Sequence, residues 1–340
     1  MKSYVKMFIF FITAATLLPI MLSAATANVK TNTSNTSQIT QSEDESQSVS
    51  ADVTVQAFDE IRVYNAKKDA VETVDLETLT ARVLYAEMPA SFNIEALKAQ
   101  AVAIRTYIIY AITNPIGDGV HDDDVDICTD YRHCVAYRTY EDAVEAYGVI
   151  TAEDTYCVML EATSATAGEY IVYNGAPINA VFHAASAGRT ESCLNIWGAD
   201  VPYLQSVETP EAEREYEEKR SFLPSELKSL LEPEGIEPLY NPTTWIGELK
   251  YNDSGRVASV EICNTVISAK KIRSLLELRS TDFTIEYVDG YFTFTTVGYG
   301  HGVGLSQYGA NTLAEAGKNY REIIAHYYTN TTVNYMSPTA

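Results

Sequence analysis

Apolar residues recur at helical spacing in two consecutive segments near the start of the foldable part of the chain. The first segment is Leu76–Glu87, and Pro89 directly after it restricts the backbone, so this helix should end near Glu87. The second runs from Ile94 to about Ile112, with Asn93 as its expected N-cap. Its apolar positions lie three and four residues apart, which predicts one buried helix face.

Alternating and β-branched stretches predict strands over much of the remaining chain. The expected strands are Phe58–Tyr64, Tyr170–Tyr173, Pro177–Phe182, Trp245–Tyr251, Val257–Cys263, Thr284–Val288 and Tyr291–Thr296, with hairpin turns at Asn174-Gly175 and Asp289-Gly290. Further helices are expected at Ala143–Ile150 and between Val297 and about Tyr328, whereas residues 113–135 form a polar, Asp-rich loop. Because helices and strands follow no βαβ rhythm, the predicted fold class is α+β with antiparallel hairpins.

The N-terminus carries a separate hydrophobic signal. Lys2 and Lys6 precede an apolar run from Met7 to about Ala25, close to the ~20 residues that cross a bilayer. Positive charge before such a run favours a cytoplasmic N-terminus and an exported body. Residues 25–27 also form an A-x-A-like cleavage site, so a cleaved signal is the alternative to the favoured anchor. We therefore expect a single-pass membrane protein with an extracytoplasmic domain, secreted if the signal is cleaved.

Composition divides the chain into three parts. Residues 1–27 are the expected anchor and 28–52 a flexible linker rich in Ser, Thr and Asn, while 53–335 form the folded domain. Residues 208–243 are charged and helix-prone, which suggests a surface insertion. The net charge of -22 argues against nucleic acid or an anionic membrane surface as a partner.

Three motifs follow one another along the folded domain. They comprise Val83–Pro89 with Glu95–Tyr107, then Phe182–Thr190 with Trp197 and Pro202–Leu204, and finally the glycine-rich Gly298–Ala310. In this order and over most of the domain, they resemble the stage II sporulation protein D family, whose domain also occurs in amidase-enhancer proteins.

The resemblance implies an activity and partners. It implies a peptidoglycan lytic transglycosylase that cleaves the bond between N-acetylmuramic acid and N-acetylglucosamine in peptide-stripped glycan, leaving a 1,6-anhydro end, during engulfment in sporulation. It also implies a glycan-binding cleft, an amidase partner and a membrane scaffold partner. Two alternatives stay open: a non-catalytic, glycan-binding amidase enhancer, and a zinc-dependent hydrolase of cell-wall peptides.

The resemblance places the catalytic glutamate at Glu87, and the local chemistry agrees. A carboxylic acid that donates a proton near neutral pH needs a raised pKa. The negative end of a helix dipole and weakly polar neighbours both disfavour a carboxylate at this position. One acid/base suffices where a sugar hydroxyl replaces water, whereas an ordinary glycosidase uses two carboxylates. Its own short motif, taken alone, favours an exposed helix-end glutamate, since glutamates mostly face solvent, and it is the other two motifs that favour the catalytic role.

Polar residues of the three motifs are candidates for binding the glycan. They are Gln100, Arg105, Ser186, Gly188, His301, Ser306, Gln307 and Tyr308. The glycines of the third motif let the backbone approach a sugar chain closely, and the motif lacks the lysine of a phosphate-binding loop. The alternatives are a simple turn with Tyr308 in the core, and a Gln100 and Arg105 that face solvent or cap a core pocket.

The Asp-rich loop also offers metal ligands. His121, Cys128 and Cys134 are the expected ligands of one zinc ion, with Glu87 or water as the fourth. His133 is held in reserve, because two adjacent side chains rarely reach one ion. A Cys128–Cys134 disulfide, permitted by export, and two unligated thiols remain alternatives. A bound zinc is expected to shape the site rather than to hydrolyse.

Overall fold

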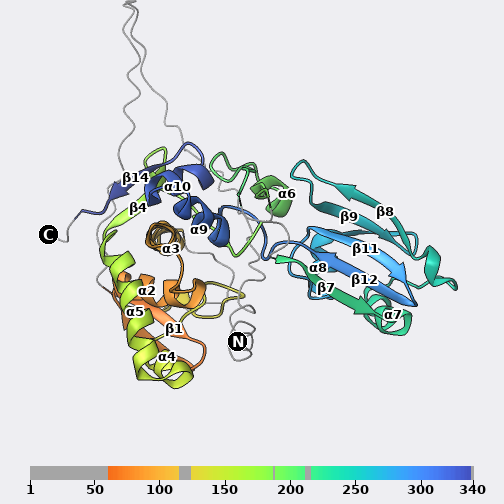
Figure 1. Ribbon diagram of the computed structural model, residues 1–340, viewed down its shortest axis with the longest axis horizontal. Coiled ribbons are helices and arrows are strands. Elements are labelled where there is room, and N and C mark those ends of the chain that lie inside the picture. Colours follow the sequence, from red (N-terminus) through yellow and green to blue (C-terminus); the bar gives the residue numbers. More distant parts are fainter. Residues whose placement is uncertain (1–59, 115–123, 187, 211–215, 338–340) are drawn as a thin grey trace, which may run out of the picture.

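The computed structural model describes residues 60–114, 124–186, 188–210 and 216–337. The expected anchor and linker lie outside these residues. Within them, no helix combines the length and apolar character that a membrane crossing requires. Figure 1 shows two bodies side by side, one built from helices around α3 and one rich in strands.

Helix α3 (Ile94–Thr113), which is buried along most of its length, lies at the centre of the first body. Alanines on its faces let other helices approach closely, and these helices are α2 (Leu76–Glu87), α5 (Val149–Ser164), α9 (Gln307–Glu315) and α10 (Tyr320–Tyr327). The predicted bounds of α2 and α3 are confirmed. The prediction of one buried face on α3 is wrong, because residues 99–109 are all buried and neighbouring elements therefore cover the helix on every side. Asn93 caps α3 as expected, its side-chain oxygen accepting from the backbone N–H of Glu95.

Short sheets line the first body. β1 (Ile61–Asn65) pairs antiparallel with β2 (Ala70–Val74) and parallel with β3 (Ile127–Cys128), and β4 (Glu169–Tyr173) lies between β5 (Ala176–Pro177) and β14 (Thr332–Tyr335). A parallel pair, β6 (Phe182–His183) with β13 (Leu305–Ser306), joins the second motif to the third. The expected strand over Pro177–Phe182 is therefore wrong, since only its ends pair.

One helix prediction is wrong in its boundaries. In place of a helix over Ala143–Ile150, α4 (Tyr140–Tyr147) ends at Gly148 and α5 begins directly after it. Gly148 has a φ of 82°, a left-handed conformation that favours glycine and interrupts the helix. The start of α4 is set by a capping box between Thr139 and Asp142. A short helix, α6 (Cys193–Trp197), follows the second motif.

The second body has its own hydrophobic core, around Phe292, Phe294 and Trp245. It contains β7 (Glu218–Phe222), α7 (Pro224–Leu231), the 3-10 turns Glu232–Glu234 and Pro242–Thr244, β8 (Ile246–Tyr251), β9 (Val257–Ile262), β10 (Thr265–Ser268), α8 (Ala269–Leu275), β11 (Phe283–Val288) and β12 (Tyr291–Thr296). Its two antiparallel sheets have the orders β10-β9-β8 and β11-β12-β7. The insertion expected at 208–243 is thus wrong in extent, because β7 pairs with β12 and the inserted body reaches Thr296.

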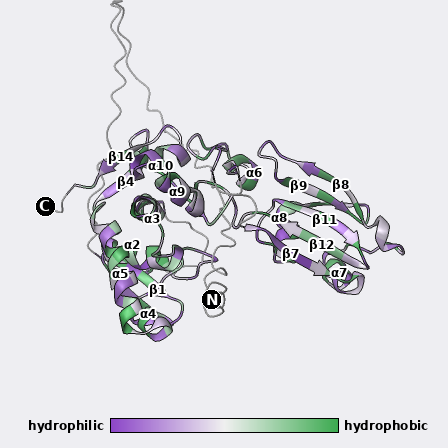
Figure 2. Cartoon of the chain, viewed as in Figure 1, coloured by the Kyte–Doolittle hydropathy of each residue, from purple (hydrophilic) through white to green (hydrophobic). Residues whose placement is uncertain are grey.

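Polar contacts fix the second body against the second motif. Glu191, buried in the first body, accepts hydrogen bonds from Asn252 Nδ2 at 2.6 Å and Ser254 Oγ at 2.8 Å, both in the turn after β8. Arg256 Nη2 donates to the carbonyl of Ser186 at 3.1 Å. Figure 2 shows hydrophilic and hydrophobic residues interspersed along the elements of both bodies, as a mixed α+β fold requires.

Candidate active site around Glu87

Glu87 is the last residue of α2. The following Met88 adopts an extended conformation, φ -124° and ψ 143°, which turns the chain away from the helix before Pro89. Glu87 is half-buried. Burial of the carboxyl raises the pKa of Glu87 to about 7, and two hydrogen bonds, from Gln307 and from the backbone N–H of Ala136, oppose that rise. The group can therefore hold or release a proton near neutral pH.

Gln307, which follows Glu87 by 220 residues in the chain, contacts its carboxyl group. Its Nε2 donates to Glu87 Oε2 at 3.2 Å. Gln307 is the first residue of α9, and the Ser306 side chain caps that helix by accepting from the N–H of Gly309. In the preceding turn, a Cβ on Gly304 would lie 2.0 Å from the carbonyl oxygen of Val181, so only glycine fits there. The glycine-rich motif thus packs against the second motif and aims Gln307 at the acid.

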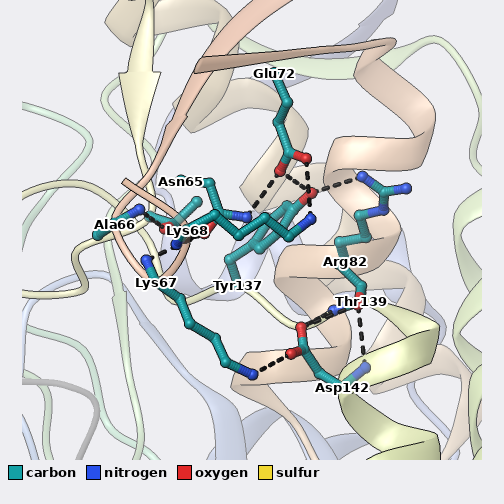
Figure 3. Close-up of polar contacts among 10 residues, drawn as sticks. Asn65, Ala66, Lys67, Lys68, Glu72, Arg82, Tyr137, Thr139 and Asp142 are labelled. Atoms are coloured by element: carbon teal, nitrogen blue, oxygen red, sulfur yellow. Dashed lines mark hydrogen bonds and ion pairs between the residues drawn. The ribbon is translucent and has the colours of Figure 1, made fainter. Parts of the chain in front are cut away.

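A polar network around Tyr137, the residue after Ala136, holds this part of the chain beside α2 (Figure 3). Tyr137 donates to Glu72 Oε1 at 2.8 Å and accepts from Arg82 Nη1 at 2.6 Å. Arg82 belongs to α2, and its carbonyl also accepts from the N–H of Arg138 at 3.1 Å. These contacts join Tyr137 and Arg138, the two residues after Ala136, to the helix that ends in Glu87. The network therefore positions the Ala136 N–H that contacts the acid.

Several of the expected glycan-binding residues are buried in the protein. Ser186 and Ser306 are almost fully buried. Ser186 Oγ contacts His183 Nε2, and His183 Nδ1 lies 3.1 Å from the carbonyl of Val303, an arrangement that links the second and third motifs. The two serines occupy positions that hold backbone segments together.

His301 and Gly188 lie near the junction of the two bodies. His301 Nδ1 accepts from the N–H of Val303 at 3.0 Å, and its ring lies 5.1 Å from that of Trp197. Burial and the nearby Arg273 lower the pKa of His301 to about 3, so its imidazole is neutral at physiological pH. The carbonyl of Gly188 accepts from the N–H of Thr209 at 3.0 Å.

Arg105 and Gln100 lie inside the first body. Arg105 is fully buried and forms a two-pronged ion pair with Glu77, Nε to Oε1 at 2.8 Å and Nη2 to Oε2 at 2.6 Å. Its remaining contacts are the carbonyls of Glu169 and Thr163. Arg105 is therefore a structural residue inside the first body, which is close to the alternative left open by the sequence, that it caps a core pocket rather than binding glycan. Gln100 is also fully buried, and its side-chain amide has no hydrogen-bond partner among the described residues.

Tyr308 follows Gln307 and is half-buried. Its ring centroid lies 4.9 Å from that of Phe92 and 4.5 Å from that of Tyr216. Of the expected glycan-binding residues, Gln307 contacts Glu87, and Tyr308 follows Gln307 directly in α9.

Three metal-binding side chains converge at the segment that leads to Ala136. The ligand atoms of Cys128, His133 and Cys134 all lie within 4.8 Å of one another, and His133 Nδ1 is 3.1 Å from Cys134 Sγ and 3.5 Å from Cys128 Sγ. The reason for holding His133 in reserve is therefore wrong. The N–H groups of both His133 and Cys134 bind the carbonyl of Asp130, and this tight turn brings the adjacent side chains together.

Two soft thiols and an imidazole at this spacing fit one tetrahedral zinc ion, whose ligands bind at about 2.0–2.3 Å. The expected ligand His121 lies outside the described residues. No disulfide joins any two of the five cysteines, all of which the structure describes.

The fold and site together define an α+β protein with a half-buried carboxylic acid, Glu87, whose raised pKa suits proton transfer. A family model described as stage II sporulation protein matches residues 64–173. The chain is 32% identical to stage II sporulation protein D of Bacillus subtilis (strain 168), over 81% of this chain and 78% of that protein. It is 34% identical to stage II sporulation protein D of Bacillus amyloliquefaciens, over 79% of this chain and 76% of that protein. The chain belongs to the stage II sporulation protein D family.

A more distant relative carries a different name. The chain is 26% identical to the amidase enhancer of Bacillus subtilis (strain 168), over 73% of this chain but 39% of that longer protein. The motif resemblance to both kinds of protein is thereby confirmed.

Proposed function

We propose that the chain is a peptidoglycan lytic transglycosylase that remodels the cell wall in sporulation, with Glu87 as its acid/base. The proposal rests on the geometry at the end of α2, where the half-buried Glu87 carboxyl accepts a hydrogen bond from Gln307, and burial raises its pKa to about 7. Such a group is protonated in a useful fraction of molecules at neutral pH and still accessible to a ligand. Family membership supports a role in sporulation.

In the proposed reaction, protonated Glu87 donates its proton to the oxygen between N-acetylmuramic acid and N-acetylglucosamine. The bond from that oxygen to the muramic C1 then breaks. The C6 hydroxyl of the same muramic residue bonds to C1, and its proton returns to Glu87, so no water is consumed and the acid is regenerated. Gln307 and the Ala136 N–H stabilise the carboxylate that exists between the two proton transfers, because both donate hydrogen bonds to it.

Cys128, His133 and Cys134 would hold a zinc ion in this proposal. A bound zinc would supply a rigid cross-link within the segment that leads, two residues after Cys134, to Ala136. The proton is transferred by Glu87 and not by a group bound to the zinc ion. In the cell, we place the domain on the outer side of the membrane, tethered by the apolar segment before residue 28, with an amidase and a membrane scaffold protein as partners.

Product analysis with Glu87→Gln tests the proposal. The protein is incubated with peptide-free glycan strands, and the products are identified by mass. The wild-type protein should release 1,6-anhydro-muramic ends, Glu87→Gln should release none, and Glu153→Gln, on the exposed face of α5, should behave like wild type. Anhydro ends formed at the normal rate by Glu87→Gln would remove Glu87 from its proposed role.

The similarity to an amidase enhancer favours a second candidate, a glycan-binding module that stimulates an amidase without cleaving glycan. Under this alternative, the strands remain intact yet co-sediment with the protein. The third candidate, a zinc-dependent peptide hydrolase, predicts peptides released from intact cell wall in a chelator-sensitive reaction. The same mass analysis, applied to intact wall and to peptide-free strands, separates the three.

A further inference from the structure

Three aromatic rings from distant parts of the chain meet at the start of α9, whose first residue, Gln307, contacts Glu87. Tyr308 lies in the middle, with Phe92 at 4.9 Å and an interplanar angle of 71° on one side, and Tyr216 at 4.5 Å and 55° on the other. Phe92 follows Glu87 by five residues, and Tyr308 follows the Gln307 that donates to Glu87. Two of the three rings, Phe92 and Tyr308, therefore belong to the segments that carry Glu87 and its partner Gln307, and Tyr216 packs against Tyr308.

Other contacts hold the rings in place. The N–H of Phe92 binds the carbonyl of Pro89 at 3.1 Å, and the N–H of Asn93 binds Asn311 Oδ1 of α9 at 2.8 Å. The N–H of Tyr308 binds the carbonyl of Ala184 at 3.0 Å. The loop before α3 and the start of α9 are thus tied to each other and to the second motif, so two of the rings sit on rigid supports.

All three rings are half-buried. Phe92 packs against the core of the first body, whereas Tyr308 and Tyr216 belong to neither of the two hydrophobic clusters. Ligand-binding sites are lined mainly by hydrophobic and aromatic side chains, so adjoining rings that keep part of their surface in water are candidates for a binding surface. Aromatic rings suit the apolar faces of sugar rings, and such stacking requires no positive charge on a protein with a net charge of -22.

We propose that Phe92, Tyr308 and Tyr216 form one aromatic surface that stacks against sugar rings of the glycan next to Glu87, and that the inserted body completes this surface through Tyr216. The identity of the ligand rests on the proposed function. Tyr216 is two residues before β7, the first strand of the second body. Because Glu191 binds the turn after β8, that body is fixed to the first and presents Tyr216 at a set position. The inserted body is thus a part of the binding site.

Glycan binding by the full-length protein tests the proposal, with Glu87→Gln as the parent so that no strand is cut. Peptide-free glycan strands are titrated in co-sedimentation. Tyr216→Ala should weaken binding about tenfold, equivalent to ~1.4 kcal/mol. Tyr216→Phe keeps the ring and should bind like the parent, as should Tyr240→Ala, which removes a fully exposed tyrosine elsewhere in the second body.

The outcomes are separable. Tyr216→Ala binding as tightly as the parent, or a parent that binds no strands, overturns the proposal. If Tyr216→Ala does not fold, Tyr216→Leu, which keeps apolar bulk without a flat ring, must show the same weakening, and normal binding by it is equally decisive. A wild-type protein that forms no anhydro ends, combined with weakened binding by Tyr216→Ala, refutes the proposed reaction and leaves the aromatic surface standing.

Discussion

Replacing Glu87 by Gln should stabilise the folded protein at alkaline pH and have little effect in acid. Burial moves the pKa of Glu87 from an ordinary 4.5 to about 7, so the native state holds this proton more tightly than the unfolded chain. Each pKa unit corresponds to about 1.4 kcal/mol, and the full difference to about 3 kcal/mol. Since Glu87 keeps some contact with water, we expect about 2–3 kcal/mol.

The sign of the effect follows from proton binding. Below pH 4.5, Glu87 is protonated in both states and has no electrostatic cost. As pH rises from 4.5 through 7, the unfolded chain loses the proton first, so wild-type stability falls, and above pH 7 the whole cost is present. A glutamine cannot ionise and escapes this loss.

Urea unfolding at pH 4 and at pH 8.5 measures the effect. The gain of Glu87→Gln over wild type should be near zero at the first pH and about 2–3 kcal/mol at the second. Glu153→Gln on the exposed face of α5 is the matched control and should match wild type at both. A gain that is equal at the two pH values, or a loss at pH 8.5, would show that the Glu87 carboxyl is not held in an environment that resists ionisation.

Three further predictions follow from the site. The rate of cleavage of peptide-free strands should fall about tenfold per pH unit above about pH 7, where Glu87 loses its proton. In Gln307→Leu this fall in rate should begin at a higher pH, because a hydrogen bond to the Glu87 carboxylate is lost. A rate that stays constant up to pH 9 contradicts the role of Glu87. Protein purified without chelator should contain about one zinc per chain by elemental analysis, and Cys134→Ser should lose it with a drop in Tm; equal metal content in both proteins refutes the cluster. Glu77→Ala should cost about 3 kcal/mol in urea unfolding, because Arg105 is left charged and fully buried; a loss below about 1 kcal/mol shows that Arg105 finds another partner or water.

The helices next to Glu87 were predictable because their ends carry local signals. Pro89 and Asn93 act within a residue or two of the boundary they set, and α2 and α3 begin and end close to where these residues place them. The extent of the inserted body had no such signal. β7 has the sequence EKRSF and becomes a strand through its pairing with β12, some seventy residues later in the chain.

The sequence predicted which side chains belong to the candidate site, but it could not predict which of them contact one another. Glu87 and Gln307 each stand in a motif, but the hydrogen bond between them spans 220 residues. The N–H of Ala136 has no side-chain signature at all. Arg105 lies in the first motif beside expected site residues, and its partner Glu77 precedes it by 28 residues, so only the packing of α2 against α3 shows that the arginine is structural.

The inserted body enters and leaves the first body at one place. Glu218, at the start of β7, is the ladder partner of Thr296, at the end of β12. The two ends of the insertion are therefore strand neighbours, about 5 Å apart. A short peptide joining them could close the path of the first body, but it would leave the buried Glu191 without Asn252 and Ser254, so the second body can be replaced only by one that supplies equivalent partners.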